Sequence, residues 1–477
     1  MMKASILTAI ATTLATFVLS GCATYSVPAN QAIDATTAPN TTPALSMFDH
    51  QKLVMRKDVS VVLAMSGGGT RAAALSYGVL KALRDIPIEV NGIKRPLLKE
   101  VDLITAVSGG SITAAYYGLR GERIFNEFED RFLRRDIGRE IGSAVLNPLH
   151  WFSRSGRTDI AADVLTQRLF GKATFADLAR SGGPMVVINA TDLARGVRFG
   201  FVNEYFNLIC SDLASYPVAN AVTASMAVPV VFNPVVLRNH GGCGRARRVA
   251  EYFESLPTNI SADTKATTQS LASYANADKR PYVHLVDGGI SDNLGLRAML
   301  DIINIPQNRG VSPQGRSPSA VASLPVLSGQ DIAARAAQSP IQRLIVIVID
   351  ASTEPESTID QSNKVPSIPA TLNAVTDTQL HRYSQLTLDE AKRTFEYFAG
   401  LSSTPEKPVS AYFIHLSINN VTSPETLHHL NQIPTALGLP AEDVRLLIDT
   451  GEQLLRQHPA LGAAVAPIKT INSAASR

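Results

Sequence analysis

The chain has 477 residues, of which 45% are hydrophobic and 18% are charged. This ordinary globular composition provides enough apolar residues to bury a sheet on both of its faces. The formal net charge is only +3 and no long block of like charges occurs, which argues against a protein that binds nucleic acid.

The first 21 residues have the pattern of a secretory signal peptide. A short basic start, Met1–Lys3, precedes an apolar stretch, Ala4–Leu19, of the length that signal peptides use. The end of this stretch, Leu19–Cys22, resembles a bacterial lipobox, whose cysteine is lipidated and becomes residue one of the mature protein. We expect Cys22 to be the membrane anchor, with a plain secretory signal as the alternative. Ala23 resembles the pattern sorted to the outer membrane, which predicts a cell-envelope lipoprotein facing the periplasm.

The rest of the chain divides by composition. Residues 22–58 are predicted to be the lipidated cysteine and a flexible linker rich in Ala, Thr, Asn and Pro. A single α/β domain is expected over 59–420, with a disordered insertion near 303–340, and a C-terminal helical extension over 421–477. After the signal no apolar stretch is long enough to span a membrane. Cys210 and Cys243 are compatible with one disulfide or with two free thiols.

The first strand–turn–helix unit carries a glycine-rich turn. A short β-branched run, 59–65, leads into Gly67, Gly68 and Gly69, and a helical pattern follows over 72–83. Consecutive glycines at the start of a helix expose backbone N–H groups that can bind an anion. The turn lacks the Lys-Ser/Thr pair of a phosphate-binding P-loop. An oxyanion site for acyl transfer or a purely structural turn remains open at this point.

The second unit places a serine at the tip of a strand. The apolar run from Val101 to Val107 stops at Ser108, two glycines follow, and residues 111–117 are compatible with a helix. Such a turn presents a hydroxyl at the edge of a parallel sheet where ligands bind. A larger side chain at Ala106 or Gly110 would lie between the strand and the returning helix. Ser108 is therefore a candidate nucleophile, or a serine in an ordinary turn.

The later elements continue the α/β pattern, and one of them ends in a carboxylate. A strand over 283–286 ends at Asp287, which Gly288 and Gly289 follow. We expect this carboxylate to lie at the functional edge of the sheet, although an aspartate in a loop is often only a turn former. The other predicted elements are strands at 185–189, 199–202, 344–349 (the most apolar and expected to be central) and 411–416, and helices at 122–151, 163–170, 219–226 and 372–398.

The sequence pattern does not single out any histidine as the base of a catalytic triad. His240, His284, His381 and His415 are candidates, and the order Ser, Asp, His would suit a Ser-His-Asp esterase with His381 or His415 last. The strand-end Asp287 favours a two-residue arrangement with Ser108 instead. No His/Cys spacing typical of a zinc site occurs, and no cofactor is expected.

Four separated motifs resemble those of the patatin-like phospholipases. They are Gly67–Arg71 (glycine-rich oxyanion loop with its arginine), Ala106–Gly110 (G-x-S-x-G), Ala224–Phe232 (A-S-x-A-x-P-x-x-F) and Asp287–Gly289 (D-G-[GA]). Ala106 replaces the first glycine of the second motif, and Ala72 closes the glycine loop where the family has Gly; alanine is a small change at both places. The resemblance spans about residues 60–352.

The resemblance implies a three-layer α/β sandwich with a mostly parallel central sheet and helices on both faces. It also implies a lipid acyl hydrolase of the phospholipase A or lysophospholipase type. Ser108 would be the nucleophile and Asp287 its partner, with the oxyanion loop Gly67, Gly68 and Gly69 and with Arg71 nearby. The substrate would be a membrane lipid. A lipid-tethered envelope protein that has lost turnover is the alternative from another class.

Overall fold

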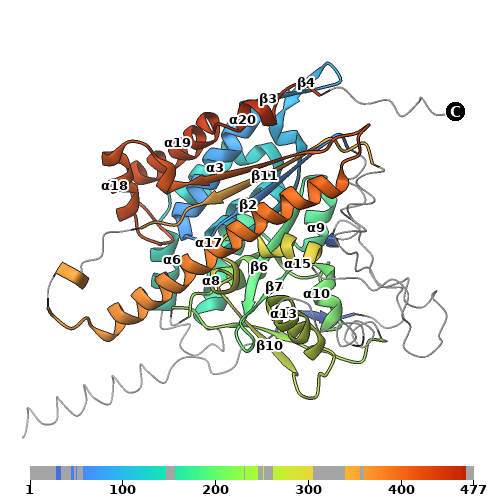
Figure 1. The fold of residues 1–477 in the computed structure, drawn as a ribbon. Coiled ribbons are helices and arrows are strands. Elements are labelled where there is room, and N and C mark those ends of the chain that lie inside the picture. Colours follow the sequence, from blue (N-terminus) through green and yellow to red (C-terminus); the bar gives the residue numbers. More distant parts are fainter. Residues whose placement is uncertain are drawn as a thin grey trace, which may run out of the picture.

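A computed structural model of the chain describes residues 28–33, 45–47, 50, 57–146, 156–229, 231–244, 251, 262–304, 339–354, 359–361 and 363–468. The signal peptide, Cys22 and most of the insertion predicted near 303–340 lie outside the described residues. Figure 1 shows a central sheet with helices packed against it.

The core of the sheet is a run of five parallel strands in the order β12-β11-β2-β5-β6. Most apolar residues of β11, β2, β5 and β6 are buried on both faces of the strands, as in all-parallel sheets covered by helices. Several apolar residues of the edge strand β12 are only partly buried. The predicted strand at 344–349 is confirmed as β11, which lies inside the sheet, second from the edge strand β12. The twelve strands of the described chain are β1 Gln31–Ala32, β2 Val59–Met65, β3 Pro87–Val90, β4 Ile93–Pro96, β5 Val101–Val107, β6 Met185–Asp192, β7 Val197–Gly200, β8 Ser211–Asp212, β9 Val235–Arg238, β10 Tyr282–Val286, β11 Arg343–Asp350 and β12 Ser410–Ser417.

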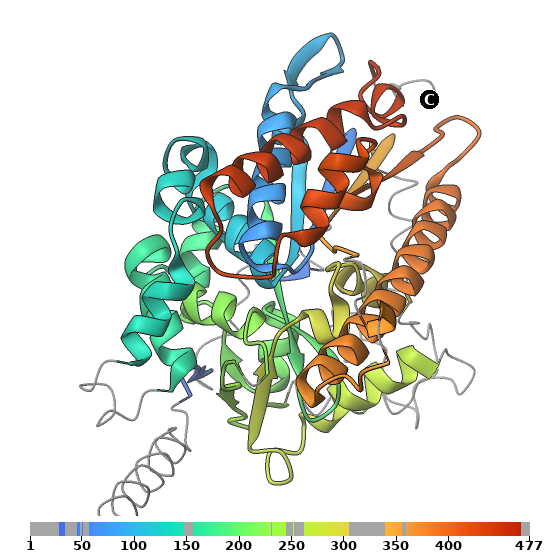
Figure 2. The ribbon, with the colours of Figure 1, turned by 90° about the vertical axis from the view of Figure 1, so that its left-hand side faces the viewer.

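Helices cover both faces of this sheet and make three layers. Helix α17 crosses one face, while α3, α4 and α19 pack on the other (Figures 1 and 2). The described helices are α3 Gly69–Asp85, α4 Ser108–Arg120, α5 Ile124–Phe128, α6 Ile137–Val145, α8 Arg157–Leu165, α9 Phe175–Arg180, α10 Asn203–Leu208, α11 Val218–Ser225, α13 Ala262–Ser273, α14 Gly289–Asp292, α15 Arg297–Asn304, α17 Ile368–Ser402, α18 Pro424–Gln432, α19 Ala441–Gln457 and α20 Leu461–Ala464. Short 3₁₀ and π segments are η2 Leu97–Glu100, η3 Gly121–Arg123, η4 Glu129–Leu133, η5 Thr166–Phe170, η6 Ile359–Gln361 and η7 Ile418–Asn420.

Helix α19, from the region predicted as a C-terminal extension, packs closely on α3. A Cβ placed on Gly78 would lie 2.1 Å from the Ile448 carbonyl oxygen, and one on Gly451 would lie 2.3 Å from the Leu75 oxygen. Glycines at the crossing therefore let the two helix backbones approach each other. Leu447 and Leu455 of α19 are buried in the same core as the strands. No described helix is long and apolar enough to cross a membrane.

Beyond β6 the sheet turns antiparallel. Strand β5 pairs with β6 only as far as Val107, opposite Asn189, whereas β6 continues to Asp192. The hairpin strand β7 and the returning strand β10 both pair antiparallel with this overhang, and β9 pairs with β10. We expected the carboxyl end of β10 to reach the functional edge as in a parallel strand. It reaches that edge from the opposite direction.

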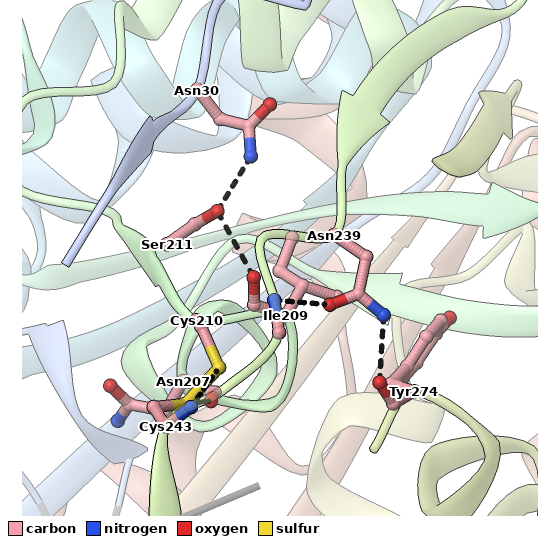
Figure 3. The surroundings of a disulfide bond; sticks show 9 residues. Asn30, Asn207, Ile209, Cys210, Ser211, Asn239, Cys243 and Tyr274 are labelled. Carbon is pink, nitrogen blue, oxygen red and sulfur yellow. Dashed lines mark hydrogen bonds between the residues drawn. A yellow bond between two sulfur atoms is a disulfide. The ribbon is translucent and has the colours of Figure 1, made fainter. Parts of the chain in front are cut away.

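A disulfide lies at this antiparallel end of the sheet. Cys210 and Cys243 are bonded, with their Cα atoms 5.8 Å apart. Figure 3 shows the surroundings of this bond, where Asn30 from the N-terminal segment hydrogen-bonds Ser211. The alternative left open by the sequence, two free thiols, is therefore excluded in this structure.

Candidate active site

Ser108 lies at the junction of β5 and α4, in a backbone conformation that few residues adopt. Its φ is +49°, in the left-handed region that costs energy for a residue with a Cβ and that is found at functional turns. The Ser108 N–H donates to the Ser225 hydroxyl at 2.8 Å. The Ser111 hydroxyl donates to the Ser108 carbonyl at 2.5 Å. These bonds fix the strained turn, so the serine side chain is positioned before any substrate arrives.

The glycines after Ser108 are required by close packing. A Cβ on Gly109 would lie 1.9 Å from the Gly69 carbonyl oxygen, and one on Gly110 would lie 2.6 Å from the Ser66 oxygen. The serine turn therefore packs directly on the glycine-rich loop. Ala106, at the first position of the motif, is fully buried in β5.

The glycine-rich loop presents two N–H groups near Ser108. A Cβ on Gly67 would lie 3.3 Å from the Ser108 Cβ, so the two turns are in contact. The Gly67 N–H donates to the Asn293 carbonyl at 3.0 Å, but within the described residues the N–H groups of Gly68 and Gly69 donate to no acceptor. Both glycines have positive φ, +134° and +60°, and they lead into α3. They therefore offer an anion site at a helix N-terminus.

The Arg71 side chain points into protein contacts. Its guanidinium donates to the Ala351 carbonyl at 2.9 Å, to the Ile433 carbonyl, and to the Thr435 hydroxyl at 3.0 Å. Burial lowers the pKa of Arg71 to about 10, so it stays charged at neutral pH. Arg71 thus ties the start of α3 to the segments that follow β11 and α18.

Asp287 reaches the same turn from β10. Its carboxylate accepts the Ser108 hydroxyl and the Gly289 N–H, the latter at 2.7 Å. Burial raises its pKa to about 6, although the hydrogen bonds from Gly289 and Ser108 act in the opposite direction. The structure therefore brings Ser108 and Asp287, 179 residues apart in the sequence, into direct contact.

Gly288 and Gly289 let the chain turn tightly beside Asp287. A Cβ on Gly288 would lie 2.3 Å from the Asn189 carbonyl oxygen, and one on Gly289 would lie 3.0 Å from the Asp287 Oδ1 atom. Any larger side chain at Gly288 would push the carboxylate loop away from the end of β6.

Ser225, at the end of α11, connects the two halves of the site. Its hydroxyl accepts the Ser108 N–H and donates to the Asn189 carbonyl at 2.6 Å. Its own carbonyl accepts the Gly288 N–H at 3.0 Å, and the Ala227 carbonyl accepts the Asp287 N–H at 2.9 Å. The sequence placed Ser225 in a recurring motif but gave it no role. Only the fold shows that this segment positions both members of the Ser108–Asp287 pair.

The region that carries this arrangement matches a known family. Residues 63–300 match a family model described as patatin-like phospholipase. This part of the chain belongs to the patatin-like phospholipase family. The match contains Ser108, Asp287, the glycine-rich loop and Ser225, so every contact that builds the Ser108–Asp287 pair lies within the patatin-like domain.

Two solved structures are distantly similar to most of the chain. Human GIVD cytosolic phospholipase A2 has 12% identity and a TM-score of 0.37, over 89% of this chain and 65% of that one. Its complex with methyl gamma-linolenyl fluorophosphonate has 12% identity and a TM-score of 0.39, over 93% and 69%. The chain thus spans about two thirds of that protein. No curated protein sequence matches the chain.

Three of the four histidines considered as a possible base have partners away from Ser108. His415 pairs with Asp350 at 3.2 Å, His381 pairs with Glu354 at 2.7 Å, and the His240 ring lies 3.3 Å from the Asn30 carbonyl oxygen. Among the described residues, no hydrogen bond joins a histidine to Ser108 or Asp287. No cluster of metal-ligating side chains is found in that part of the chain either.

The raised pKa of Asp287 predicts how activity depends on pH. The carboxylate can accept the Ser108 proton only when it is ionised, so we expect kcat/KM to fall tenfold per pH unit below about pH 6. The pH profile of kcat/KM on a soluble short-chain ester tests this. A profile that is flat from pH 7 to about 4, the ordinary range for a carboxylate, would contradict it.

Ser225→Ala should slow the reaction without unfolding the protein. Removal of the hydroxyl takes away the partner of the Ser108 N–H and of the Asn189 carbonyl, which costs on the order of 1 to 3 kcal/mol. We expect kcat to fall about 10- to 100-fold because Ser108 loses its anchor. The control is Thr223→Ala on the same helix, since the Thr223 hydroxyl is buried but donates only to Ala219. Equal kcat values in the two variants at matched stability would show that Ser225 has no positioning role.

Proposed function

We propose that the protein is a serine acyl hydrolase that cleaves carboxylic esters of membrane lipids, in the manner of a phospholipase A or lysophospholipase. The observation that carries the proposal is the buried hydrogen bond from the Ser108 hydroxyl to Asp287. Beside it lie the N–H groups of Gly68 and Gly69, which donate to no acceptor in the part of the chain that the structure describes. A nucleophile, a base and an oxyanion site in contact are the minimum set for acyl transfer.

The reaction follows from these positions. Asp287 accepts the Ser108 proton while the Ser108 oxygen attacks the ester carbonyl carbon. The N–H groups of Gly68 and Gly69 stabilise the oxyanion that forms. The protonated Asp287 then gives its proton to the departing alcohol, and the fatty acyl group remains on Ser108. Asp287 next takes a proton from water, whose oxygen attacks the acyl group, and the proton returns to Ser108 as the fatty acid leaves.

Arg71 supports the oxyanion site indirectly in this proposal. Its donors are directed at the backbone around Ala351 and Ile433, so it holds the loop that carries Gly68 and Gly69. The Thr70 N–H, which donates to the Ala436 carbonyl at 2.7 Å, fastens the same loop. The preorganised loop costs no reorganisation when the oxyanion forms.

We further propose that Cys22 is lipidated and that the enzyme acts at the outer membrane from the periplasmic side. The support is the signal-like segment ending in Leu19–Cys22. The disulfide between Cys210 and Cys243 agrees with an oxidising compartment. A lipid anchor would hold the active site where its substrate is concentrated.

Mass spectrometry of lipids tests the activity. Native envelope lipids incubated with the wild-type protein should release free fatty acids and lysolipids, and Ser108→Ala protein should release neither. Single substitutions of His240, His284, His381 and His415 should each keep turnover within about tenfold of the wild type, because none is needed as the base. Loss of turnover in one histidine variant that stays folded would favour a Ser-His-Asp esterase instead.

A further inference from the structure

The N-terminal segment folds back onto the antiparallel end of the sheet. Residues 28–33, here called the N-terminal clasp, include β1, which pairs with β8. The Asn30 side chain is only 6% exposed. Its amide donates to the Ser211 hydroxyl at 2.6 Å and to the Arg238 carbonyl at 2.8 Å, and its oxygen accepts the Arg238 N–H at 2.8 Å. Every polar group of this side chain is therefore bonded to the domain.

The disulfide holds together the two segments that receive the clasp. Cys210 directly precedes β8, and its carbonyl accepts the Ile33 N–H at 3.0 Å. Cys243 follows β9, whose last residue, Arg238, bonds Asn30. Figure 3 shows Asn30 and this disulfide in one view. The clasp site is thus a covalently braced feature of the fold.

Docking of the clasp shortens the tether to Cys22. The sequence predicted a linker that reaches Val59, whereas Asn30 is only eight residues from Cys22. Eight residues span at most about 29 Å, even when fully extended. A lipid on Cys22 would therefore hold the membrane beside the clasp.

The surface next to the clasp suits a lipid interface. We define the sheet tip as residues 192–197, 235–238 and 282–284, which extend the sheet beyond Ser108. Leu193 and Tyr282 are 52% and 47% exposed there, and the Leu193 N–H bonds the His284 carbonyl at 2.9 Å. Arg195 and Arg238 are exposed beside them. An aromatic and an aliphatic side chain flanked by arginines is typical of a surface that contacts anionic headgroups.

We propose that the sheet tip lies against the membrane and that the N-terminal clasp sets this orientation. The inference rests on the proposed lipid anchor at Cys22. Because the tip continues from the edge that carries Asp287, this orientation turns the active-site end of the sheet toward the lipid. Figure 1 places β10 and the β3–β4 hairpin at opposite ends of the molecule, so the hairpin faces away from the membrane.

A fluorescent label tests whether the sheet tip or the β3–β4 hairpin faces the membrane. With Cys22 acylated and Cys210 bonded to Cys243, a cysteine introduced by Tyr282→Cys, or by Leu193→Cys as a second variant, is the only free thiol of the full-length protein. The matched control is Ile93→Cys in the β3–β4 hairpin, where Ile93 is 63% exposed. After labelling with an environment-sensitive dye, the proteins are bound to phosphatidylglycerol–phosphatidylcholine vesicles with brominated acyl chains. Labels at 282 and 193 should be quenched, and the label at 93 should not.

Two insertions test the role of the clasp. A flexible insert of about 20 residues after Ser26 lengthens the chain between Cys22 and the clasp, and should lower the effective concentration of the tip at the membrane about sixfold. The same insert after Thr37, beyond the clasp, should leave quenching at 282 unchanged. Equal effects of the two inserts on the quenching of the label at 282, or equal quenching at 93 and 282, would overturn the inference. Failure of the proteins to float with vesicles would overturn both it and the anchor at Cys22, whereas flotation without quenching at 282 would overturn the inference alone.

Discussion

Replacing Ser108 by alanine lowers kcat on any ester substrate by about 10⁴-fold or more, because the residual rate then comes only from binding and the oxyanion site. Asp287→Asn has a similar effect, since an amide cannot take the serine proton. Steady-state hydrolysis of a short-chain ester measures both losses. A Ser108→Ala protein that keeps full activity would rule out the proposed nucleophile.

The stability of the Asp287→Asn protein separates a catalytic defect from a folding defect. Because burial raises the folded-state pKa of Asp287 to about 6, above its unfolded value, the ionised carboxylate destabilises the folded protein at neutral pH. The amide removes this charge and can still accept the Gly289 N–H. We expect the variant to be on the order of 1 to 3 kcal/mol more stable at pH 7, with the gain vanishing as pH falls through 6 toward 4. A lower melting temperature than wild type at pH 7 would contradict this explanation.

Gly109→Ala should lower activity strongly, although less than Ser108→Ala, without removing any catalytic group. The new Cβ would lie 1.9 Å from the Gly69 carbonyl oxygen, so the serine turn and the glycine-rich loop must move apart. Displacement of an oxyanion donor lowers kcat by about 10²- to 10³-fold, and overpacking costs about 1 to 3 kcal/mol. Ester hydrolysis and thermal unfolding of the variant measure the two effects.

Gly142→Ala is the matched control for that variant. Gly142 lies in the helix α6 with nothing within 4 Å of the position of a Cβ, so alanine should stabilise the helix by about 0.5 to 1 kcal/mol. Its kcat should equal that of the wild type. Wild-type activity in Gly109→Ala would show that the serine turn and the loop tolerate separation.

Local sequence pattern was sufficient for the elements that carry the site. The β-branched run at 59–65 and the apolar run ending at Val107 became β2 and β5 with the predicted bounds, because buried parallel strands need continuous apolar residues. Ser108 follows from the sharp change between such a strand and two glycines. Asp287 was predicted at the edge of the sheet that carries Ser108, and it lies there although β10 runs antiparallel. Its position depends on the turn that Gly288 and Gly289 permit and not on the direction of the strand.

The contacts between distant segments could not be predicted in this way. Ser225 binds the Ser108 N–H across 117 residues, and a serine in a helix of small residues carries no local sign of that bond. The clasp at Asn30 was hidden for a similar reason, since its partners Ser211 and Arg238 belong to short strands formed only in the assembled fold. The sequence of a polar, proline-containing segment is typical of a linker, and its docking site exists only in the assembled fold.

Covalent labelling with an alkyl fluorophosphonate tests the central claim most directly. The reagent forms a stable phosphonyl ester with a serine that a neighbouring base activates, and peptide mass spectrometry then identifies the modified residue. If the Ser108–Asp287 pair is catalytic, one adduct forms, on Ser108. It is absent from Ser108→Ala protein and forms far more slowly in Asp287→Asn protein. An adduct on a different serine, or labelling that persists in Ser108→Ala, would contradict the assignment of Ser108 as the nucleophile.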